Sequence, residues 1–171
     1  PVAGGGVRIY NSSPSLEDLI VTDNMISSEF PASGGGMYLY NAHPIVTDTV
    51  IKDTVTTLKY GGANNGIGVY MNQSDPVFTR VEIVNNTSTE GGKGAGVYMV
   101  DSSPVFNDVR IAENFADDSG AGVFMDSSTP VFNRVTIEDN VSNTTGGGIY
   151  MSDSDADLNW IRVQGNTAVE Q

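Results

Sequence analysis

The sequence predicts an all-β fold in which the chain winds into a parallel β-helix, a solenoid of about six coils with three short strands in each coil. One observation behind this prediction is a glycine that occurs at six positions, 26 to 32 residues apart. Each time it is followed directly by two apolar residues with one other residue between them. The other is that a proline, a core-sized apolar residue and an asparagine follow this glycine at fixed distances. Periods of this length are typical of stacked repeats, and helical periodicity is absent.

The recurring glycines divide the chain into coils. They are Gly6, Gly36, Gly68, Gly96, Gly122 and Gly148. The predicted coils are approximately 1–30, 31–61, 62–90, 91–116, 117–142 and 143–171. Because the pattern runs through the whole sequence, residues 1–171 are predicted to form a single β-helix fragment without evident end caps.

Each coil contains three stretches of three to five residues that suit a strand. The first follows the glycine, as at residues 97–99, and the second contains the apolar residue after proline, such as Phe106. The third has apolar residues at alternate positions, such as Val109 and Ile111. Residues that favour turns separate these stretches. No stretch can bury its apolar side chains alone, so the coils are expected to stack about 4.8 Å apart and to form ladders of like residues.

An asparagine stands eighteen residues after each recurring glycine except one, where Thr54 replaces it. Asparagine tolerates left-handed backbone geometry, and its amide can bond to an asparagine one coil away. We therefore interpret this column as structural. Its members are Asn24, Asn86, Asn114, Asn140 and Asn166.

Three motifs together resemble a known repeat: Gly-Gly-Gly-Ile-Tyr at 146–150, Ser-x-Pro-x-Phe at 102–106 and Val-x-Ile-x-x-Asn at 109–114. They resemble the right-handed parallel β-helix repeats, of the pectate-lyase-like superfold, that occur in secreted bacterial and archaeal surface proteins. They are also similar to the repeats of polymorphic outer-membrane proteins and adhesins. The Phe-x-x-Asn signature of those outer-membrane proteins is not reproduced, since Val109 stands three residues after Phe106. The resemblance implies a right-handed coil. It does not imply catalysis, because the lyase and polygalacturonase motifs Asn-Thr-Asp, Gly-His-Gly and Arg-Ile-Lys are missing.

Charge narrows the classes of partner. Eight basic and 21 acidic residues give a formal net charge of −13, so we expect no nucleic-acid binding, which requires a basic surface. We also expect no membrane insertion, because no run approaches the roughly 18 apolar residues that a membrane helix needs. The acidic, lysine-poor composition suits an extracellular or cell-surface location.

The middle residue of the first strand is expected to point outward, since the residues on either side of it are aliphatic or methionine. After Arg8, this column is aromatic: Tyr38, Tyr70, Tyr98, Phe124 and Tyr150. Rings repeated along an axis could stack on sugar rings and so form a ligand-binding face. Two alternatives stay open: the rings stabilise the sheet face, or a flanking domain covers them.

Acidic residues follow the first strand. Asp101, Asp126 and Asp153 could contribute oxygen ligands to Ca²⁺. Aspartate also favours turns, and the spacing matches no dedicated calcium loop. No cofactor is expected, and Ca²⁺ is the one ion that the sequence suggests.

On the third strand, the outward column alternates in charge from Asp48 through Arg80 and Asp108 to Arg134, which predicts ion pairs that fix the register. Residues 56–65, within the longest connection between coils, are a candidate recognition loop.

The expected function is that of a noncatalytic extracellular β-helix segment of a surface or secreted protein, acting in adhesion, in carbohydrate binding or as a structural stalk. We do not expect an enzyme, because no nucleophile, base and orienting group can be assembled. One alternative is a fragment of a polysaccharide lyase or glycoside hydrolase. Another is a subunit of a self-assembling extracellular filament. The expected partners are flanking coils or domains of a longer chain, or another copy stacked end to end, and a polysaccharide.

Overall fold

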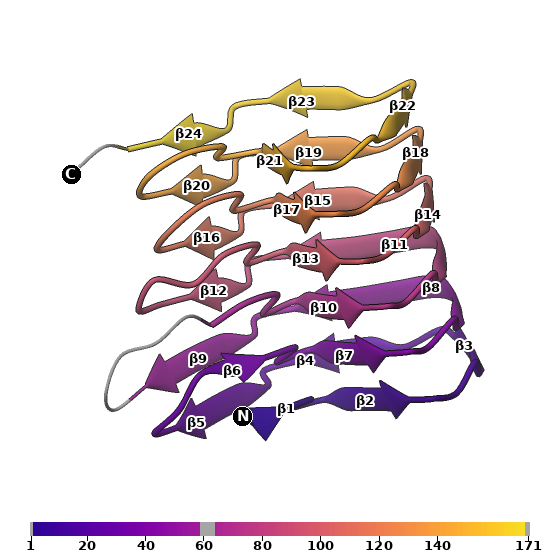
Figure 1. Ribbon diagram of the computed structural model, residues 1–171, viewed down its shortest axis with the longest axis horizontal. Coiled ribbons are helices and arrows are strands. Elements are labelled where there is room, and N and C mark those ends of the chain that lie inside the picture. Colours follow the sequence, from indigo (N-terminus) through magenta and orange to yellow (C-terminus); the bar gives the residue numbers. More distant parts are fainter. Residues whose placement is uncertain (1, 59–63, 170–171) are drawn as a thin grey trace.

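A computed structural model describes residues 2–58 and 64–169. Six coils stack along one axis, and the strands of each sheet lie above one another from the N-terminal to the C-terminal coil (Figure 1). Every strand pairing is parallel, and each strand pairs with its equivalent in the next coil. The predicted parallel β-solenoid with three sheets is confirmed.

Three sheets of six, ten and six strands and one two-stranded pair form in the described residues. The first sheet contains β2 (Val7–Tyr10), β7 (Met37–Tyr40), β10 (Val69–Asn72), β13 (Val97–Val100), β17 (Val123–Asp126) and β21 (Ile149–Ser152). The second sheet contains β3 (Ser15–Glu17), β4 (Ile20–Thr22), β8 (Ile45–Lys52), β11 (Val77–Val84), β14 (Val105–Asn107), β15 (Arg110–Ala112), β18 (Val131–Asn133), β19 (Thr136–Glu138), β22 (Asp157–Asn159) and β23 (Arg162–Gln164). The third sheet contains β5 (Met25–Ser28), β9 (Val55–Leu58), β12 (Thr87–Ser88), β16 (Phe115–Ala116), β20 (Val141–Ser142) and β24 (Thr167–Ala168). The separate pair is β1 (Val2–Ala3) with β6 (Ala32–Ser33).

Four left-handed backbone positions recur along the coils, and three of them are occupied by residues other than glycine, except at Gly165. The φ angles of these non-glycine residues fall between 46° and 57°, a region that glycine and short polar residues visit at the lowest cost. The first position follows the first sheet: Asn11, Asn41, Gln73, Asp101, Ser127 and Asp153. The second, an elbow within the second sheet, is Asp18, Asp48, Arg80, Asp108, Arg134 and Trp160. The third precedes the asparagine column: Asp23, Asp53, Asn85, Glu113, Asp139 and, in the last coil, Gly165.

The elbow corrects one sequence interpretation. The column from Asp48 to Arg134 does not lie on the flat outer face of a strand but at a bend, where the backbone is left-handed. The bend divides the second-sheet strand in two in the first, fourth, fifth and sixth coils, whereas β8 and β11 run through it. Side chains at a convex bend splay outward, which leaves room for long ion-paired side chains.

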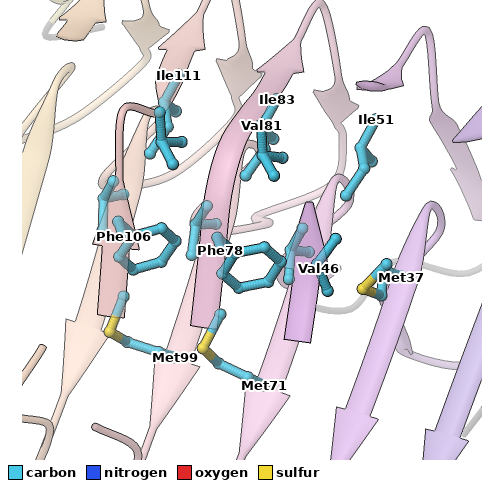
Figure 2. Packing of buried hydrophobic residues seen from close by; sticks show 14 of the residues in the cluster. Met37, Val46, Ile51, Met71, Phe78, Val81, Ile83, Met99, Phe106 and Ile111 are labelled. Atoms are coloured by element: carbon cyan, nitrogen blue, oxygen red, sulfur yellow. The ribbon is translucent and has the colours of Figure 1, made fainter. Parts of the chain in front are cut away.

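The core lies between the three sheets and is built from columns of like residues. The central ladder consists of Phe78, Phe106 and Phe132, which are fully buried and stack with ring centroids 5.2 and 4.9 Å apart. Methionines such as Met71 and Met99 from the first sheet pack against this ladder, as do Ile83 and Ile111 from the second (Figure 2).

The recurring glycine marks close contact between coils rather than a special backbone angle. A β-carbon at Gly96 would lie 2.6 Å from the carbonyl oxygen of Gly122 and 2.9 Å from the side-chain nitrogen of Asn114. Nothing larger fits, because the next coil and the asparagine column already occupy this space. The spacing between glycine and asparagine in the sequence therefore reflects direct packing.

Candidate functional site

The aromatic column of the first sheet forms one continuous stack. Tyr38, Tyr70, Tyr98, Phe124 and Tyr150 pair in register across β7, β10, β13, β17 and β21. Successive ring centroids are 5.1, 5.3, 5.0 and 4.9 Å apart, and the ring planes differ by at most 6°. The flanking residues, such as Val69 and Met71, are fully buried in the core, as predicted.

The stack is less exposed than an open binding stripe. The four tyrosines are half-buried, and Phe124 is buried with 6% of its surface exposed. Each inner ring presents both faces to its neighbours, so its edge, not its face, meets solvent. A sugar that stacks on an aromatic ring needs a free face. The geometry therefore fits the sheet-stabilising alternative better than a row of sugar platforms.

Two tyrosines widen the stack at the N-terminal end, and the sequence interpretation missed them. Tyr10 and Tyr40 lie two residues after Arg8 and Tyr38, and their rings stack at 5.3 Å. The Arg8 guanidinium lies 6.0 Å from the Tyr10 ring centroid and 5.7 Å from that of Tyr38, within the range of cation–π attraction. The signal was present in the sequence, because two positions further along the same strand also face outward.

A lysine covers the middle of the stack. The Lys93 ammonium lies 5.1 Å from the Phe124 ring centroid and 3.6 Å from a carboxylate oxygen of Asp118. Lys93 precedes β13 by a few residues and reaches the ring from the preceding coil. The spacing of the first-strand residues alone could not reveal this contact, because the lysine belongs to the variable connection between coils.

Burial changes the acidity of the phenols. Loss of solvation, reinforced by the neighbouring Tyr70 and Asp126, raises the pKa of Tyr98 to about 12. Loss of solvation also raises the pKa of Tyr38, although the Arg8 charge opposes it. These hydroxyls therefore remain neutral in the physiological range, where they can donate and accept hydrogen bonds.

The three aspartates suggested for Ca²⁺ do not form one column. Asp101 is aligned with Ser127 and Asp153, whereas Asp126 is aligned with Val100 and Ser152. Within residues 2–58 and 64–169, no group of three or more His, Cys, Asp or Glu side chains is arranged to hold a metal. Asp101 and Asp153 occupy left-handed turn positions, which accounts for the residue type there.

The asparagine column is a hydrogen-bonded ladder. The side-chain oxygen of Asn114 accepts the backbone and side-chain N–H groups of Asn86, both at 3.0 Å. The Asn114 side-chain nitrogen in turn donates to Asn140 at 2.9 Å and to the Ile83 carbonyl at 3.0 Å. The same pattern links Asn140 to Asn166. Thr54 interrupts the side-chain ladder between Asn24 and Asn86.

A second internal ladder was not predicted. In the turn before the prolines, the backbone N–H of each residue donates to the serine hydroxyl one coil later, and that hydroxyl donates to a carbonyl two residues before it. The serines are Ser74, Ser102, Ser128 and Ser154. Ser74, Ser102 and Ser128 are buried, so this ladder satisfies backbone groups that would otherwise be unpaired. Its signal was a serine at a constant distance from the recurring glycine.

The alternating charges at the elbow pair as predicted. Arg80 donates from Nε and Nη2 to the two carboxylate oxygens of Asp48, both at 2.6 Å. Arg134 makes the same two-point contact with Asp108 at 2.6 and 2.7 Å. These arginines lower the pKa of the Asp48 and Asp108 carboxyl groups.

The candidate recognition loop, residues 56–65, has its central residues 59–63 outside the described part of the chain. Among the described residues, no helix has the length and apolar character needed to span a membrane.

These features define the class of protein: a parallel β-solenoid whose coils are joined by internal ladders of asparagine, serine and phenylalanine and by an outward ladder of tyrosine. The family described as "right handed beta helix region" matches residues 4–171, and the chain belongs to this family. No curated protein matches the chain.

Proposed function

We propose that this chain is a noncatalytic segment of an extracellular or cell-surface protein and acts as a rigid stalk. The observation that carries the proposal is the continuity of the ladders, above all the aromatic stack that runs through five successive coils without a break in register. Interiors packed in this way resist deformation. A stalk needs such a column, because it must hold what it carries at a fixed distance from its base.

The stacking of the aromatic rings on one another supports the role of a rigid stalk. Rings that stack on one another contribute packing energy between coils, of about 0.5–1.5 kcal/mol per aromatic pair. The asparagine and serine ladders add hydrogen bonds between the same coils. Every coil is therefore fastened to the next at several points around its circumference.

A distance measurement tests the rigidity. The described residues contain no cysteine, so spin labels on cysteines introduced at two exposed positions, Ser13 and Ser127, report one distance. A stalk predicts a single narrow distribution that keeps its width when Asn133, on the outside of the second sheet, is replaced by serine. A broad or multimodal distribution in the folded chain would contradict the proposal.

Carbohydrate binding along the edge of the aromatic stack is the second candidate. The half-exposed edges of Tyr38, Tyr70, Tyr98 and Tyr150 favour it, since a row of phenol hydroxyls can bond to saccharide hydroxyls. A glycan array with and without Ca²⁺ tests this candidate. Tyr70→Phe/Tyr98→Phe removes the hydroxyls and keeps the stack, whereas Tyr70→Ala/Tyr98→Ala removes both. Loss of binding in both variants supports an edge site, and binding that survives the Phe variant assigns the contact to the rings.

A polysaccharide-degrading activity ranks below these roles. Such chemistry needs carboxyl groups on both sides of a bound sugar linkage, and the outward column of the first sheet is aromatic. Incubation with plant, algal and bacterial polysaccharides, followed by a reducing-end assay, checks this ranking. Release of reducing ends by the purified chain would reverse it.

We also propose that the natural neighbour of the last coil is another β-helix coil, from a longer chain or from a second copy. Met151, Leu158 and Val163 occupy inward columns but are 48, 42 and 51% exposed. Apolar surface of this kind is stabilised by burial. Sedimentation over a range of concentrations distinguishes the two sources, because only stacking of copies depends on concentration.

A further inference from the structure

The first coil has a hollow of about 230 Å³. All the residues that line it belong to this coil: Gly6, Val7, Ile20, Val21, Thr22 and Asn24. Among the described strands, β2 and β4 pair only with strands of the second coil, so their other edges face away from the stack. In the later coils a preceding coil covers the equivalent edge. The hollow therefore lies where a preceding coil would pack.

The last coil presents apolar side chains on the opposite end of the stack. Met151, Leu158 and Val163 are about half exposed, whereas their equivalents one coil earlier are fully buried. The column of Val163 runs back through the stack to Val21, which lines the hollow. If the first coil of a second copy followed the last coil, Val163 would pack against this hollow.

The asparagine ladder is incomplete at both ends, and the two ends are complementary. From Asn86 onward, each asparagine donates its backbone and side-chain N–H groups to the side-chain oxygen of the asparagine one coil later. Asn166 is the last of the column, and its side-chain nitrogen donates to the Gln164 carbonyl of its own coil at 3.0 Å. The side-chain oxygen of Asn24 accepts no hydrogen bond within the described part of the chain. Asn24 of a second copy would therefore continue the ladder.

The serine ladder ends in the same way. The backbone N–H of Ser128 donates to the Ser154 hydroxyl at 3.0 Å, but the N–H of Ser154 has no acceptor among the described residues. Ser12 occupies the same position in the first coil, and its hydroxyl donates to the Tyr10 carbonyl at 3.0 Å. Ala42 follows Ser12 in this column and offers no hydroxyl. Ser12 thus has the geometry of a ladder serine, and its oxygen is free to accept from Ser154 of another copy.

Charge does not oppose such a junction, although the net charge of the chain is −13. When residues 149–169 are aligned with residues 7–27 in the register of the recurring glycines, every charged residue faces an uncharged one. Arg8 of the second copy would follow Tyr150. Within one copy the Arg8 guanidinium already lies 5.7 Å from the Tyr38 ring centroid, so the same cation–π contact would form on both sides of Arg8.

We propose that the last coil binds the first coil of a second copy of this chain, which rests on the proposal above that another β-helix coil covers the last coil. The copies join head to tail with their strand pairings and ladders continuous. A contact between two unlike ends does not close on itself unless the axis curves into a ring, so the straight stack grows into an open filament along the solenoid axis.

Sedimentation velocity of the whole chain over a range of concentrations tests the junction, together with electron microscopy. The expected result is a mass that rises with concentration and unbranched rods one solenoid wide. Val163→Glu should weaken association by about tenfold or more, because it places an unpaired carboxylate inside the junction. Ile45→Glu is the matched control: Ile45 is 52% exposed and Val163 is 51% exposed, but Ile45 lies on the outer face of the second coil. This variant should associate within about twofold of the original chain.

A second pair of variants tests the register at a position where substitution leaves the core intact. Ile20 is 72% exposed and would follow Arg162 across the junction. Ile20→Glu adds an opposite charge beside Arg162 and should tighten association, whereas Ile20→Lys adds a like charge and should weaken it. The two variants should differ by about fivefold at low ionic strength, and by less at high salt. This comparison holds even if Val163→Glu does not fold.

The head-to-tail junction is overturned if the chain remains a monomer at every concentration or forms only a closed dimer. It is also overturned if Ile45→Glu weakens association as much as Val163→Glu, or if Ile20→Glu and Ile20→Lys associate equally. A monomer with a narrow spin-label distance distribution would refute the junction and leave the stalk intact. Broad distances within stacked copies would contradict the stalk and leave the junction intact.

Discussion

The side-chain amide of Asn114 donates to the side-chain oxygen of Asn140 at 2.9 Å, one coil further along the axis. Both side chains are fully or almost fully buried. The contact belongs to a chain of such bonds in which every donor and acceptor of Asn114 is used. The main effect of these bonds on stability is that they avoid a penalty, because a buried amide or carbonyl group without a hydrogen-bond partner costs free energy.

Asn114→Ala should lower the free energy of unfolding by about 3–5 kcal/mol, because it leaves donors of Asn86 and the carbonyl of Ile83 without partners. Chemical denaturation measures the loss. Asn133→Ala, at a half-buried position on the outer face, is the control and should cost less than about 1 kcal/mol. Equal losses of unfolding free energy in the two variants would show that the buried asparagine ladder contributes no more to stability than a position on the outer face.

Thr54→Asn should stabilise the chain by about 1 kcal/mol, because it would join Asn24 to the rest of the ladder. Thr54 already donates its backbone N–H to Asn86 at 3.2 Å, but among the described residues its hydroxyl bonds only to the Lys52 carbonyl. Thermal unfolding of Thr54→Asn beside Thr54→Val checks the prediction. A melting temperature of Thr54→Asn no higher than that of Thr54→Val would show that the interruption of the asparagine ladder at Thr54 does not reduce stability.

Gly96→Ala should be destabilising by about 3 kcal/mol, because the new methyl group would lie 2.6 Å from the Gly122 carbonyl oxygen. Gly91→Ala provides the contrast. There a β-carbon meets nothing within 4 Å, but φ is +71°, so only the left-handed penalty of about 1–2 kcal/mol applies. Denaturant midpoints of both variants separate crowding from backbone strain, and a reversed order would contradict the packing argument.

Tyr98→Phe should make the chain less sensitive to alkaline pH. The pKa of Tyr98 is raised to about 12 in the folded state from an ordinary value near 10. Burial of the neutral phenol therefore contributes stability below about pH 10 that is lost as the pH rises through 12. The loss should be about 1–2 kcal/mol, since solvent screens the half-exposed group. The difference in unfolding free energy between the two proteins should therefore change by this amount between neutral and alkaline pH, and a difference that stays constant would refute the assignment.

Asp108→Asn should reduce stability at neutral pH and lose its effect in acid. Arg134 lowers the pKa of the Asp108 carboxyl group, so the stabilisation is present above the unfolded pKa of about 4 and disappears as the pH falls through the lower folded value. Asp157→Asn removes the same charge where no ion pair forms among the described residues. The stability difference between the two variants, followed by thermal unfolding from neutral to acidic pH, should vanish at low pH.

Much of the fold follows from the sequence, because each coil repeats the same local requirements. The alternation around Val69 and Met71 assigns the inward face, and Pro104 and Phe106 assign a corner and the core residue beyond it. The ion pair of Asp48 with Arg80 could be predicted because parallel stacking places equivalent positions in neighbouring coils beside each other. In a stacked repeat, residues that are one repeat apart in the sequence therefore contact each other in neighbouring coils.

Contacts between different columns were decided only by the tertiary structure. Spacing along the chain cannot show that Gly96 touches Asn114 or that Lys93 reaches Phe124. Spacing along the chain also could not show that the tyrosine rings stack face to face on one another. The residues that align in a ladder follow from the spacing of the repeat, which can be measured in the sequence. Hollows and exposed faces depend on how far the backbone bends at each left-handed corner and on where long side chains then lie, which only the folded coil determines.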